Sequence, residues 1–204
     1  MPEPGPDLGG VILAAGASER MGEPKALLRL PAPPRKCLLV DQIDRLRRAG
    51  CARVAVVLGA DAVRIKPALP SGDPRAIVCL NEGWQRGSFS SLQVGLTALA
   101  DCARGALVLP VDVPGVPPQV MTGLVPRGDD APDAVVPMHQ GRGGHPVWLS
   151  PALIARILRE PPTARLDHLL AGCVVARVEV ADPHVRENVN TPEDWARYLS
   201  ESGA

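Results

Sequence analysis

Residues 11–25 read VILAAGASERMGEPK, an apolar run that passes directly into a loop of small and charged residues. The first five residues, Val11–Ala15, predict a buried strand because they are apolar and include β-branched side chains. The loop that follows contains two glycines and carries Arg20 and Lys25. Glycine lets the backbone approach a ligand closely, and free N–H groups beside two cations form an anion cradle. This strand and loop therefore predict a binding site for phosphate groups.

The loop does not match two common nucleotide-binding fingerprints. Lys25 does not follow Gly22, so the GxxxxGK[ST] pattern of P-loop proteins is excluded. The GxGxxG pattern of dinucleotide-binding folds is absent as well. The alternative is an ordinary loop between a strand and a helix, with a solvated arginine and lysine. Two cations and two glycines in so short a loop favour phosphate binding over that alternative.

Outside this loop, short apolar runs alternate with stretches of helical periodicity. The predicted strands are Arg53–Leu58, Ala76–Leu80 and Ala106–Val111, and the predicted helices are Leu39–Ala49 and Ser90–Ala100. The apolar run that ends at Leu58 is typical of a strand buried on both faces of a parallel sheet. Ser90 and Ser91 are predicted to cap the second helix at its N-terminus. The alternation predicts a parallel sheet covered by helices.

The second half of the chain is less regular. Two predicted strands, Ala134–Pro137 and Pro146–Leu149, flank a glycine-rich turn at residues 141–144. Val174–Val180 alternates apolar and polar residues, which predicts a half-buried or edge strand. The remaining segments predict helices at Pro151–Leu158, at Leu166–Ala171, and after Thr191 with Pro192 in the first position.

Length and composition limit the classes of protein that fit. A chain of 204 residues is long enough to bury its own core, so we expect one domain over residues 1–204. Lysine plus arginine equals aspartate plus glutamate at 22 each, and no basic stripe is present. A nucleic-acid partner is therefore not expected. The five cysteines form no CxxC pair and are expected to be small core residues in a reducing compartment.

The sequence also predicts where the protein resides. No apolar run approaches the roughly 18 residues needed to span a bilayer, so no membrane partner is expected. The N-terminal sequence MPEPGPDLGG lacks the basic and apolar regions of a signal peptide. We therefore expect a cytoplasmic protein.

Four segments are candidates for ligand binding, because ligands of open α/β sheets bind beyond the carboxyl ends of the strands. They are the loop after Ala15, the segment before Ser90, Asp112 at the end of a strand, and the segment before Thr191. Asp112 alone is suited either to a metal ion or to a helix cap.

Five sequence blocks together carry a resemblance to a known family. They are LAAGASERMGEPKALL at 13–28, the residues Asn81, Trp84, Gly87, Ser91, Leu92, Gly95 and Leu96, PVDVP at 110–114, GHP at 144–146, and NTPED at 190–194. In this order they resemble the nucleotidyltransferases of molybdenum cofactor synthesis and, more broadly, the glycosyltransferase-A-like NTP transferases. The resemblance spans residues 13–194. It implies an α/β fold of three layers, Rossmann-like, with a mostly parallel central sheet.

The resemblance also implies a role for each site residue. The nucleotide-binding residues would be Leu13, Ala14, Ala15, Gly16, Ser18, Arg20, Lys25, Asn81, Gly87, Ser90 and Ser91. Arg20, Lys25 and Asp112 would be catalytic, with the two cations on the phosphates of the nucleotide. Asp112 and Asn190 would hold Mg²⁺, the expected cofactor, which prefers oxygen ligands. His145 would lie on the side of the acceptor.

The reaction implied by the resemblance is nucleotidyl transfer. The phosphate of molybdopterin or molybdenum cofactor would attack the α-phosphorus of a nucleoside triphosphate, and pyrophosphate would leave. Positioning and charge neutralisation dominate such chemistry, and an anionic acceptor needs no general base. Leu-Ala-Ala-Gly at 13–16, with no Asp before Lys25, resembles the cytidylyl branch, whereas Asn188 and Asn190 resemble the guanylyl branch. We expect CTP as the donor.

Other interpretations stay open. The same blocks fit a molybdenum cofactor guanylyltransferase, an NTP transferase for another phosphorylated acceptor, and a nucleotide-fold binding or delivery factor for a molybdoenzyme. His145 also fits a turn histidine bonded to the backbone. Asp167 and His168 are expected to be solvated or capping residues of a helix, and His139 and His184 are expected to be surface residues.

Overall fold

The computed structural model describes residues 8–31, 35–69, 72–73, 75–99, 102, 104–128 and 130–201. In this part of the chain, eight strands form a single sheet. Their bounds are β1 Leu8–Ala14, β2 Cys51–Leu58, β3 Ala76–Leu80, β4 Ala106–Pro110, β5 Ala134–His139, β6 Arg142–Gly143, β7 Val147–Leu149 and β8 Val175–Glu179.

The sheet is mostly parallel, as the sequence predicts. The strand order is β3-β2-β1-β4-β7-β5-β6, and β8 pairs with β5. The pairs β1–β2, β2–β3, β1–β4 and β5–β8 are parallel, while β7 runs antiparallel to both β4 and β5. Ile12 at the centre pairs with Val56 on one side and Leu109 on the other. The carboxyl ends of β1 and β4 therefore lie side by side.

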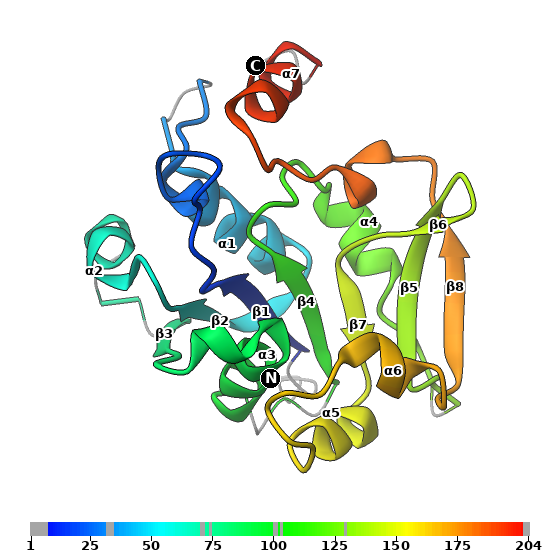
Figure 1. Cartoon of the computed structure of the whole chain (residues 1–204). Coiled ribbons are helices and arrows are strands. Elements are labelled where there is room, and N and C mark those ends of the chain that lie inside the picture. The colour runs from blue at the N-terminus through cyan, green and yellow to red at the C-terminus, as the bar shows by residue number, and fades with distance from the viewer. Residues whose placement is uncertain are drawn as a thin grey trace.

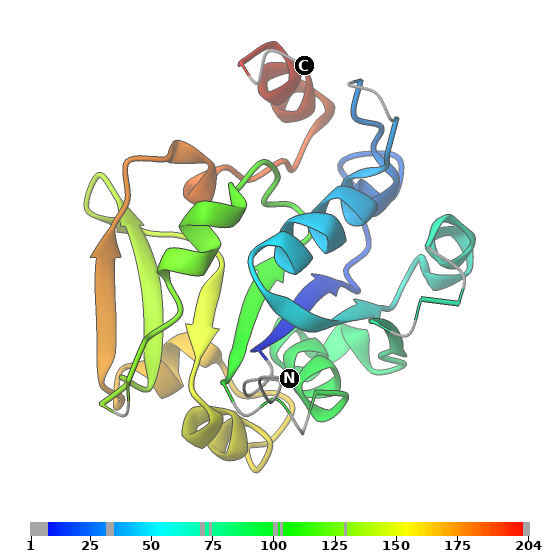
Figure 2. The ribbon, with the colours of Figure 1, turned by 180° about the vertical axis from the view of Figure 1, so that it is seen from behind.

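Helices cover both faces of this sheet. Their bounds are α1 Leu38–Arg48, α2 Ala62–Ile65, α3 Ser88–Thr97, α4 Pro118–Gly123, α5 Pro151–Ile157, α6 Leu166–Leu170 and α7 Pro192–Glu201. Figure 1 shows α3, α5 and α6 in front of the sheet, and Figure 2 shows α1 and α4 on the other face. The three-layer α/β architecture is confirmed. Among the described helices, none is both long enough and apolar enough to cross a bilayer.

The alternation of side chains along the strands divides the core into two clusters. Ile12 and Ala14 of β1 pack with α1 and α4, whereas Val11 packs with α3 and α5. The strands β1, β2 and β4 are buried on both faces because helices cover each side. The strand β8 has exposed residues, which confirms the predicted edge position.

Strand β1 begins at Leu8, three residues before the predicted start. The sequence obscured this start because Gly9 and Gly10 are poor strand formers. Packing explains both glycines: a Cβ on Gly9 would lie 3.0 Å from Leu99 Cδ1, and one on Gly10 would lie 3.2 Å from Leu46 Cδ1.

Helix α3 begins at Ser88, and the predicted N-terminal cap by Ser90 and Ser91 is wrong. Gly87 is the N-cap residue, with φ of 106°, a backbone conformation that favours glycine. Both serines lie buried inside the helix. The Ser90 hydroxyl donates to the Gly87 carbonyl oxygen at 2.8 Å. The helix ends at Thr97, and Ala100, the last residue of the prediction, lies outside the described residues.

Two histidines predicted at the surface are half-buried instead. His139 Nδ1 lies 3.0 Å from the Val180 carbonyl oxygen, and His184 Nδ1 lies 2.8 Å from Asp182 Oδ1. The prediction for these residues was wrong because both partners, Val180 and Asp182, lie in the irregular segment after β8, where sequence periodicity gives no signal. Cys51 is buried in the core as predicted, and burial raises the pKa of its thiol to about 12.

Candidate active site

A cavity of about 960 Å³ lies at the carboxyl ends of β1 and β4, and it is larger than a second cavity described below. Its walls come from the loop after β1, from the residues 84–92 at the start of α3, from the end of β4, and from residues 163–167 at the start of α6. Val136 and Val147 line it from β5 and β7. A cavity of this size, with apolar walls and a few convergent polar groups, is typical of a small-molecule site.

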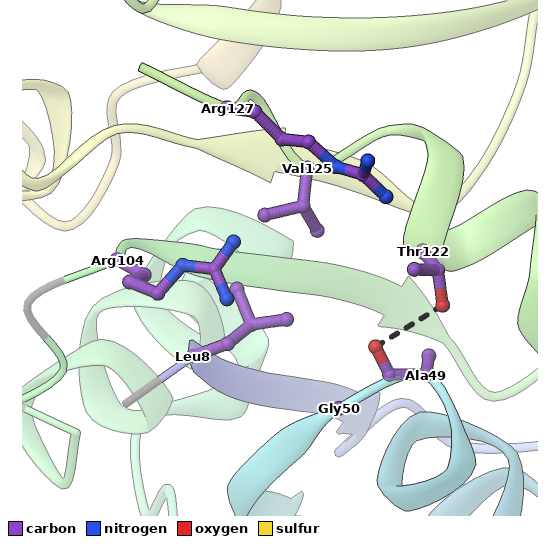
Figure 3. A pocket seen from close by; sticks show the side chains of 7 residues that line it. All are labelled: Leu8, Ala49, Gly50, Arg104, Thr122, Val125 and Arg127. Atoms are coloured by element: carbon purple, nitrogen blue, oxygen red, sulfur yellow. Dashed lines mark hydrogen bonds between the residues drawn. The ribbon is translucent and has the colours of Figure 1, made fainter. Parts of the chain in front are cut away.

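The smaller cavity, of about 200 Å³, lies at the opposite ends of the strands (Figure 3). Leu8, the first residue of β1, lines it together with Val125, and Arg104 and Arg127 extend from different segments. The Thr122 hydroxyl donates to the Ala49 carbonyl oxygen at 3.2 Å, which ties α4 to the end of α1. Because ligands of open α/β sheets bind at the carboxyl ends, the larger cavity is the candidate active site.

Lys25 joins two distant segments at the rim of the larger cavity. Its backbone N–H donates to the Ser18 hydroxyl at 3.0 Å, which closes the loop after β1. Its Nζ donates to Asn190 Oδ1 at 2.7 Å and to Asp112 Oδ2 at 3.3 Å. The Lys25 side chain is 13% exposed. Three residues predicted from separate sequence blocks therefore meet at one point.

The segment that carries Asn190 is held by the start of α7. The backbone N–H groups of Asn190 and Thr191 both donate to Asp194 Oδ2 at 3.0 Å, and the Asp194 N–H donates to Thr191 Oγ1 at 3.2 Å. This reciprocal cap confirms the predicted helix start. The Val189 N–H donates to the Asp112 carbonyl oxygen at 2.8 Å, so the segment is also fastened beside Asp112.

These contacts predict a pH dependence of stability. The hydrogen bond from Asn190, followed by that from Arg197, holds the pKa of Asp194 at about 2, below its usual 3.8. A lowered pKa stabilises the fold above pH 4, and that contribution is lost as the pH falls toward 2. We expect the difference in melting temperature between wild type and Asp194→Ala to shrink as the pH falls from 5 to 2. Glu193→Ala is the control for loss of a carboxylate in the same turn. A melting-temperature difference between wild type and Asp194→Ala that stays constant with pH would contradict the stabilising role of the ionised Asp194.

The loop after β1 lies close to the end of β2. The Ala60 N–H donates to the Ala15 carbonyl oxygen at 3.0 Å, and a Cβ on Gly59 would overlap that same oxygen. A Cβ on Gly16 would meet no protein atom within 4 Å, so this glycine leaves free space where the loop lines the cavity. The predicted nucleotide-binding residues Leu13, Ala15, Gly16 and Ser18 all line the cavity.

The other predicted nucleotide-binding residues have different surroundings. Gly87 and Ser91 line the cavity. Asn81 is 2% exposed, and its Nδ2 donates to Ser90 Oγ at 2.9 Å and to Ser91 Oγ at 3.0 Å, so it ties the end of β3 to α3. Ala14 packs in the core on the α1 face of the sheet.

Arg20 is exposed at the outer side of the loop. Its Nη2 lies 3.5 Å from Asn190 Oδ1, on the same amide oxygen that accepts from Lys25. The contact is long for a hydrogen bond and leaves the guanidinium available to an anion. The two predicted phosphate-binding cations therefore converge on Asn190.

His145 lines the cavity and is mostly buried. Its backbone N–H donates to the Val185 carbonyl oxygen at 2.7 Å, and its peptide bond to Pro146 is cis. Its Nδ1 is buried and has no hydrogen-bond partner among the described residues. Burial lowers the pKa of His145, while Asp112 partly opposes that shift. Burial therefore favours the neutral form of this imidazole on the cavity wall.

Several cavity residues were not among the sequence-predicted site residues. Trp84, Arg86 and Phe89 line the wall that precedes and begins α3, and Trp84 could have been found from its block. Arg165 and Asp167 line the opposite wall, where Arg165 Nη2 donates to Asp167 Oδ2 at 2.7 Å. Sequence gave no signal for this pair because neither residue belongs to a block.

The oxygens around Lys25 fit a hard divalent cation. Asp112 Oδ2 and Asn190 Oδ1 both converge on the Lys25 ammonium, so this point already holds a positive charge between a carboxylate and an amide oxygen. Mg²⁺ binds through one or two protein oxygens together with phosphate oxygens and water. In the described ranges, no group of three or more His, Cys, Asp or Glu side chains could hold a metal.

Comparison with known proteins identifies the family. Residues 10–179 match the family described as MobA-like NTP transferase domain. This chain belongs to the MobA-like NTP transferase family. The match covers strands β2 to β8, β1 from Gly10 onward, the loop after β1 and Asp112, whereas Asn190 lies beyond it.

The relatives of this MobA-like NTP transferase have different names. It is 30% identical to the nicotine blue oxidoreductase of Paenarthrobacter nicotinovorans, over 95% of this chain and 97% of that protein. It is 27% identical to a probable molybdenum cofactor guanylyltransferase of Mycobacterium avium, over 95% and 89%. It is 24% identical to the molybdenum cofactor cytidylyltransferase of Escherichia coli, over 91% and 92%.

Solved structures also resemble this MobA-like NTP transferase. The crystal structure of Rv0371c from Mycobacterium tuberculosis superimposes with a TM-score of 0.78 at 27% identity, over 95% of this chain and 98% of that one. A complex of Rv0371c with manganese superimposes with a TM-score of 0.73 at 26% identity, over the same shares of both chains.

Proposed function

We propose that this protein is a nucleotidyltransferase that moves CMP from CTP to the phosphate of molybdopterin or molybdenum cofactor and releases pyrophosphate. The observation that carries the proposal is the convergence of Lys25, Asp112 and Asn190 at the rim of a cavity of about 960 Å³. The names of the guanylyl and cytidylyl relatives support the choice of acceptor.

The protein's part in this reaction is to position the reactants and to neutralise charge. The loop after β1 would wrap the triphosphate, with Arg20 and Lys25 against the phosphate oxygens. An oxygen of the acceptor phosphate forms a bond to the α-phosphorus, and the bond from that phosphorus to the bridging oxygen of pyrophosphate breaks. His145, which lines the cavity near Asp112, would contact the acceptor.

Asp112 and Asn190 would hold Mg²⁺ in this enzyme. When bound, the ion supplies positive charge to the phosphate oxygens. A relative whose structure contains manganese supports a divalent cation. The carboxylate of Asp112 carries the negative charge that keeps the cation in the site, and Lys25 contributes a second positive charge beside it.

The choice of CTP over GTP rests on Ala15, which lines the cavity and is 5% exposed. A β-carbon there narrows the space beside the loop, and a two-ring purine needs a closer backbone approach than a one-ring pyrimidine. We expect kcat/KM to be higher for CTP, and Ala15→Gly to shift the ratio toward GTP by about tenfold or more.

The matched control for this prediction is Ala14→Gly. It loosens the same strand end, but the Ala14 side chain packs on the other face of the sheet, so the CTP to GTP ratio should stay unchanged. Equal kcat/KM values for CTP and GTP in the wild type, or a preference for GTP, would contradict the proposal and favour the guanylyltransferase.

Pyrophosphate release from CTP, GTP and ATP, each with and without molybdopterin, tests the proposed function. Release from CTP that depends on molybdopterin supports it. Release that depends instead on a sugar or polyol phosphate would assign another acceptor, and nucleotide binding without release would assign a binding or delivery factor. Because one relative is named nicotine blue oxidoreductase, reduction of nicotine blue is measured on the same preparation, and that activity alone would contradict the proposal.

A further inference from the structure

Gln42 is a polar side chain of α1 that is fully buried, with 0% exposure. Its Nε2 lies close to three backbone carbonyl oxygens at the end of β4 and in the segment that follows it. The distances are 3.2 Å to Pro110, 3.2 Å to Val111 and 2.9 Å to Val113. These three residues flank Asp112 on both sides. A single amide group therefore contacts the backbone immediately before and after the candidate metal ligand.

The segment after β4 needs such contacts because it cannot continue the sheet. Pro110 and Pro114 have no N–H groups, so they cannot donate to a neighbouring strand. One turn beyond Gln42 on the same helix, Arg45 Nη1 donates to the carbonyl oxygens of Gly115 at 3.1 Å and Val116 at 3.3 Å. Side chains of α1 thus hold the backbone that carries Asp112.

The surroundings of Gln42 also carry a cost in free energy. Its Oε1 is buried without a hydrogen-bond partner among the described residues. Burial of an unpaired amide oxygen is unfavourable, and an apolar side chain of similar size would avoid that cost. A buried polar group without a hydrogen-bond partner is expected where function requires that residue. The functional residue beside the carbonyl groups that Gln42 contacts is Asp112.

We infer that Gln42 is a positioning residue, which holds the backbone on both sides of Asp112 so that the carboxylate stays beside Lys25 and Asn190. This inference rests on the proposed function, because there Asp112 binds the cation. Gln42 itself does not line the cavity. Loss of a group that orients a metal ligand typically lowers metal affinity by about 10–100-fold.

The test compares Gln42→Met with Gln93→Met. Methionine keeps the length and unbranched shape of glutamine but lacks the N–H donors. Gln93 is the matched control, because its Nε2 also donates to backbone carbonyl oxygens, those of Ile157 at 2.8 Å and Glu160 at 2.7 Å. None of these three residues lines the cavity. Binding of Mn²⁺ alone is measured from the EPR signal of the free ion, together with kcat, KM for CTP and the melting temperature.

We expect Gln42→Met to weaken Mn²⁺ binding at least about tenfold and to lower kcat, with KM for CTP changed by less than about twofold. Gln93→Met should lower the melting temperature but leave Mn²⁺ affinity and kcat unchanged. If Gln42→Met does not fold, Gln42→Asn replaces it, since its shorter amide cannot reach all three carbonyl oxygens and should give an intermediate loss.

Asp112→Asn separates failure of this inference from failure of the proposed function. If Asp112→Asn loses Mn²⁺ binding but folded Gln42→Met or Gln42→Asn binds Mn²⁺ as the wild type does, the positioning role is overturned and the metal site stands. Equal losses of Mn²⁺ affinity in the Gln42 and Gln93 variants would also overturn the positioning role of Gln42. If Asp112→Asn keeps wild-type Mn²⁺ affinity, the metal site of the proposed function is itself wrong.

Discussion

Asp112→Ala is expected to lower kcat with Mg²⁺ by about a hundredfold or more while the fold stays intact. The carboxylate faces Lys25 Nζ at 3.3 Å beside the cavity, and its loss removes the only carboxylate that the proposed function places on the cation. The backbone of the segment does not depend on this side chain, because the Asp112 carbonyl oxygen accepts from Val189 N–H. Turnover is measured as pyrophosphate release, and folding by circular dichroism.

Asp73→Ala is the matched control for Asp112→Ala. The Asp73 side chain is 18% exposed against 28% for Asp112, and it also pairs with a cation, Arg47, but outside the cavity. Asp73→Ala should lower stability and leave turnover unchanged. If Asp112→Ala keeps more than about a tenth of the wild-type rate, less than ~1.4 kcal/mol in the barrier, Asp112 is not the metal ligand.

The second large effect is expected for Lys25→Ala, which should lower kcat and also weaken nucleotide binding. The ammonium lies between Asp112 and Asn190 and is held there by the loop after β1. Charge that grows on the phosphate oxygens in the transition state is stabilised by such a fixed cation, so a loss of about a hundredfold in kcat is expected. Steady-state kinetics with CTP separates kcat from KM.

Lys36→Ala is the control for Lys25→Ala. Lys36 also forms an ion pair, with Asp44, and its side chain is 31% exposed, but it does not line the cavity. Its loss should change neither kinetic constant. If Lys25→Ala raises KM for CTP and leaves kcat unchanged, Lys25 binds the substrate and the transition state equally well. That result would contradict its catalytic role.

Most of the fold could be predicted because the strands and helices have strong periodic signals. Arg53–Leu58 is a strand as expected, since buried parallel strands are continuously apolar. Ala76–Leu80 is also a strand, although it is half-exposed at the edge of the sheet. The start of β1 and the cap of α3 were predicted wrongly. Gly9 is in a strand because of what it packs against, and Gly87 caps a helix through its backbone angles. The two features depend on tertiary contacts or φ values, which local sequence propensity does not predict.

The residues of the candidate site could be predicted from separate sequence blocks, but their arrangement in space could not. Lys25, Asp112 and Asn190 were named from three blocks, and the structure brings them within hydrogen-bond distance. The role of Gln42 could not be predicted. Its position, three residues after Leu39 and four before Leu46, lies on the apolar face of the helix, but its hydrogen-bond partners lie about 70 residues further along the chain. The cavity wall of Arg165 and Asp167 was missed because neither residue belongs to one of the five blocks.

Transfer of label from the nucleotide to the acceptor tests the central claim most directly. The purified protein is incubated with Mg²⁺, molybdopterin and CTP labelled with ³²P at the α-phosphate, and the products are separated. The proposed function predicts that the label joins molybdopterin in a one-to-one ratio with the pyrophosphate released, and that Asp112→Ala abolishes both. Label that remains in CTP, or that appears only as free CMP while pyrophosphate is released, would contradict nucleotidyl transfer to this acceptor.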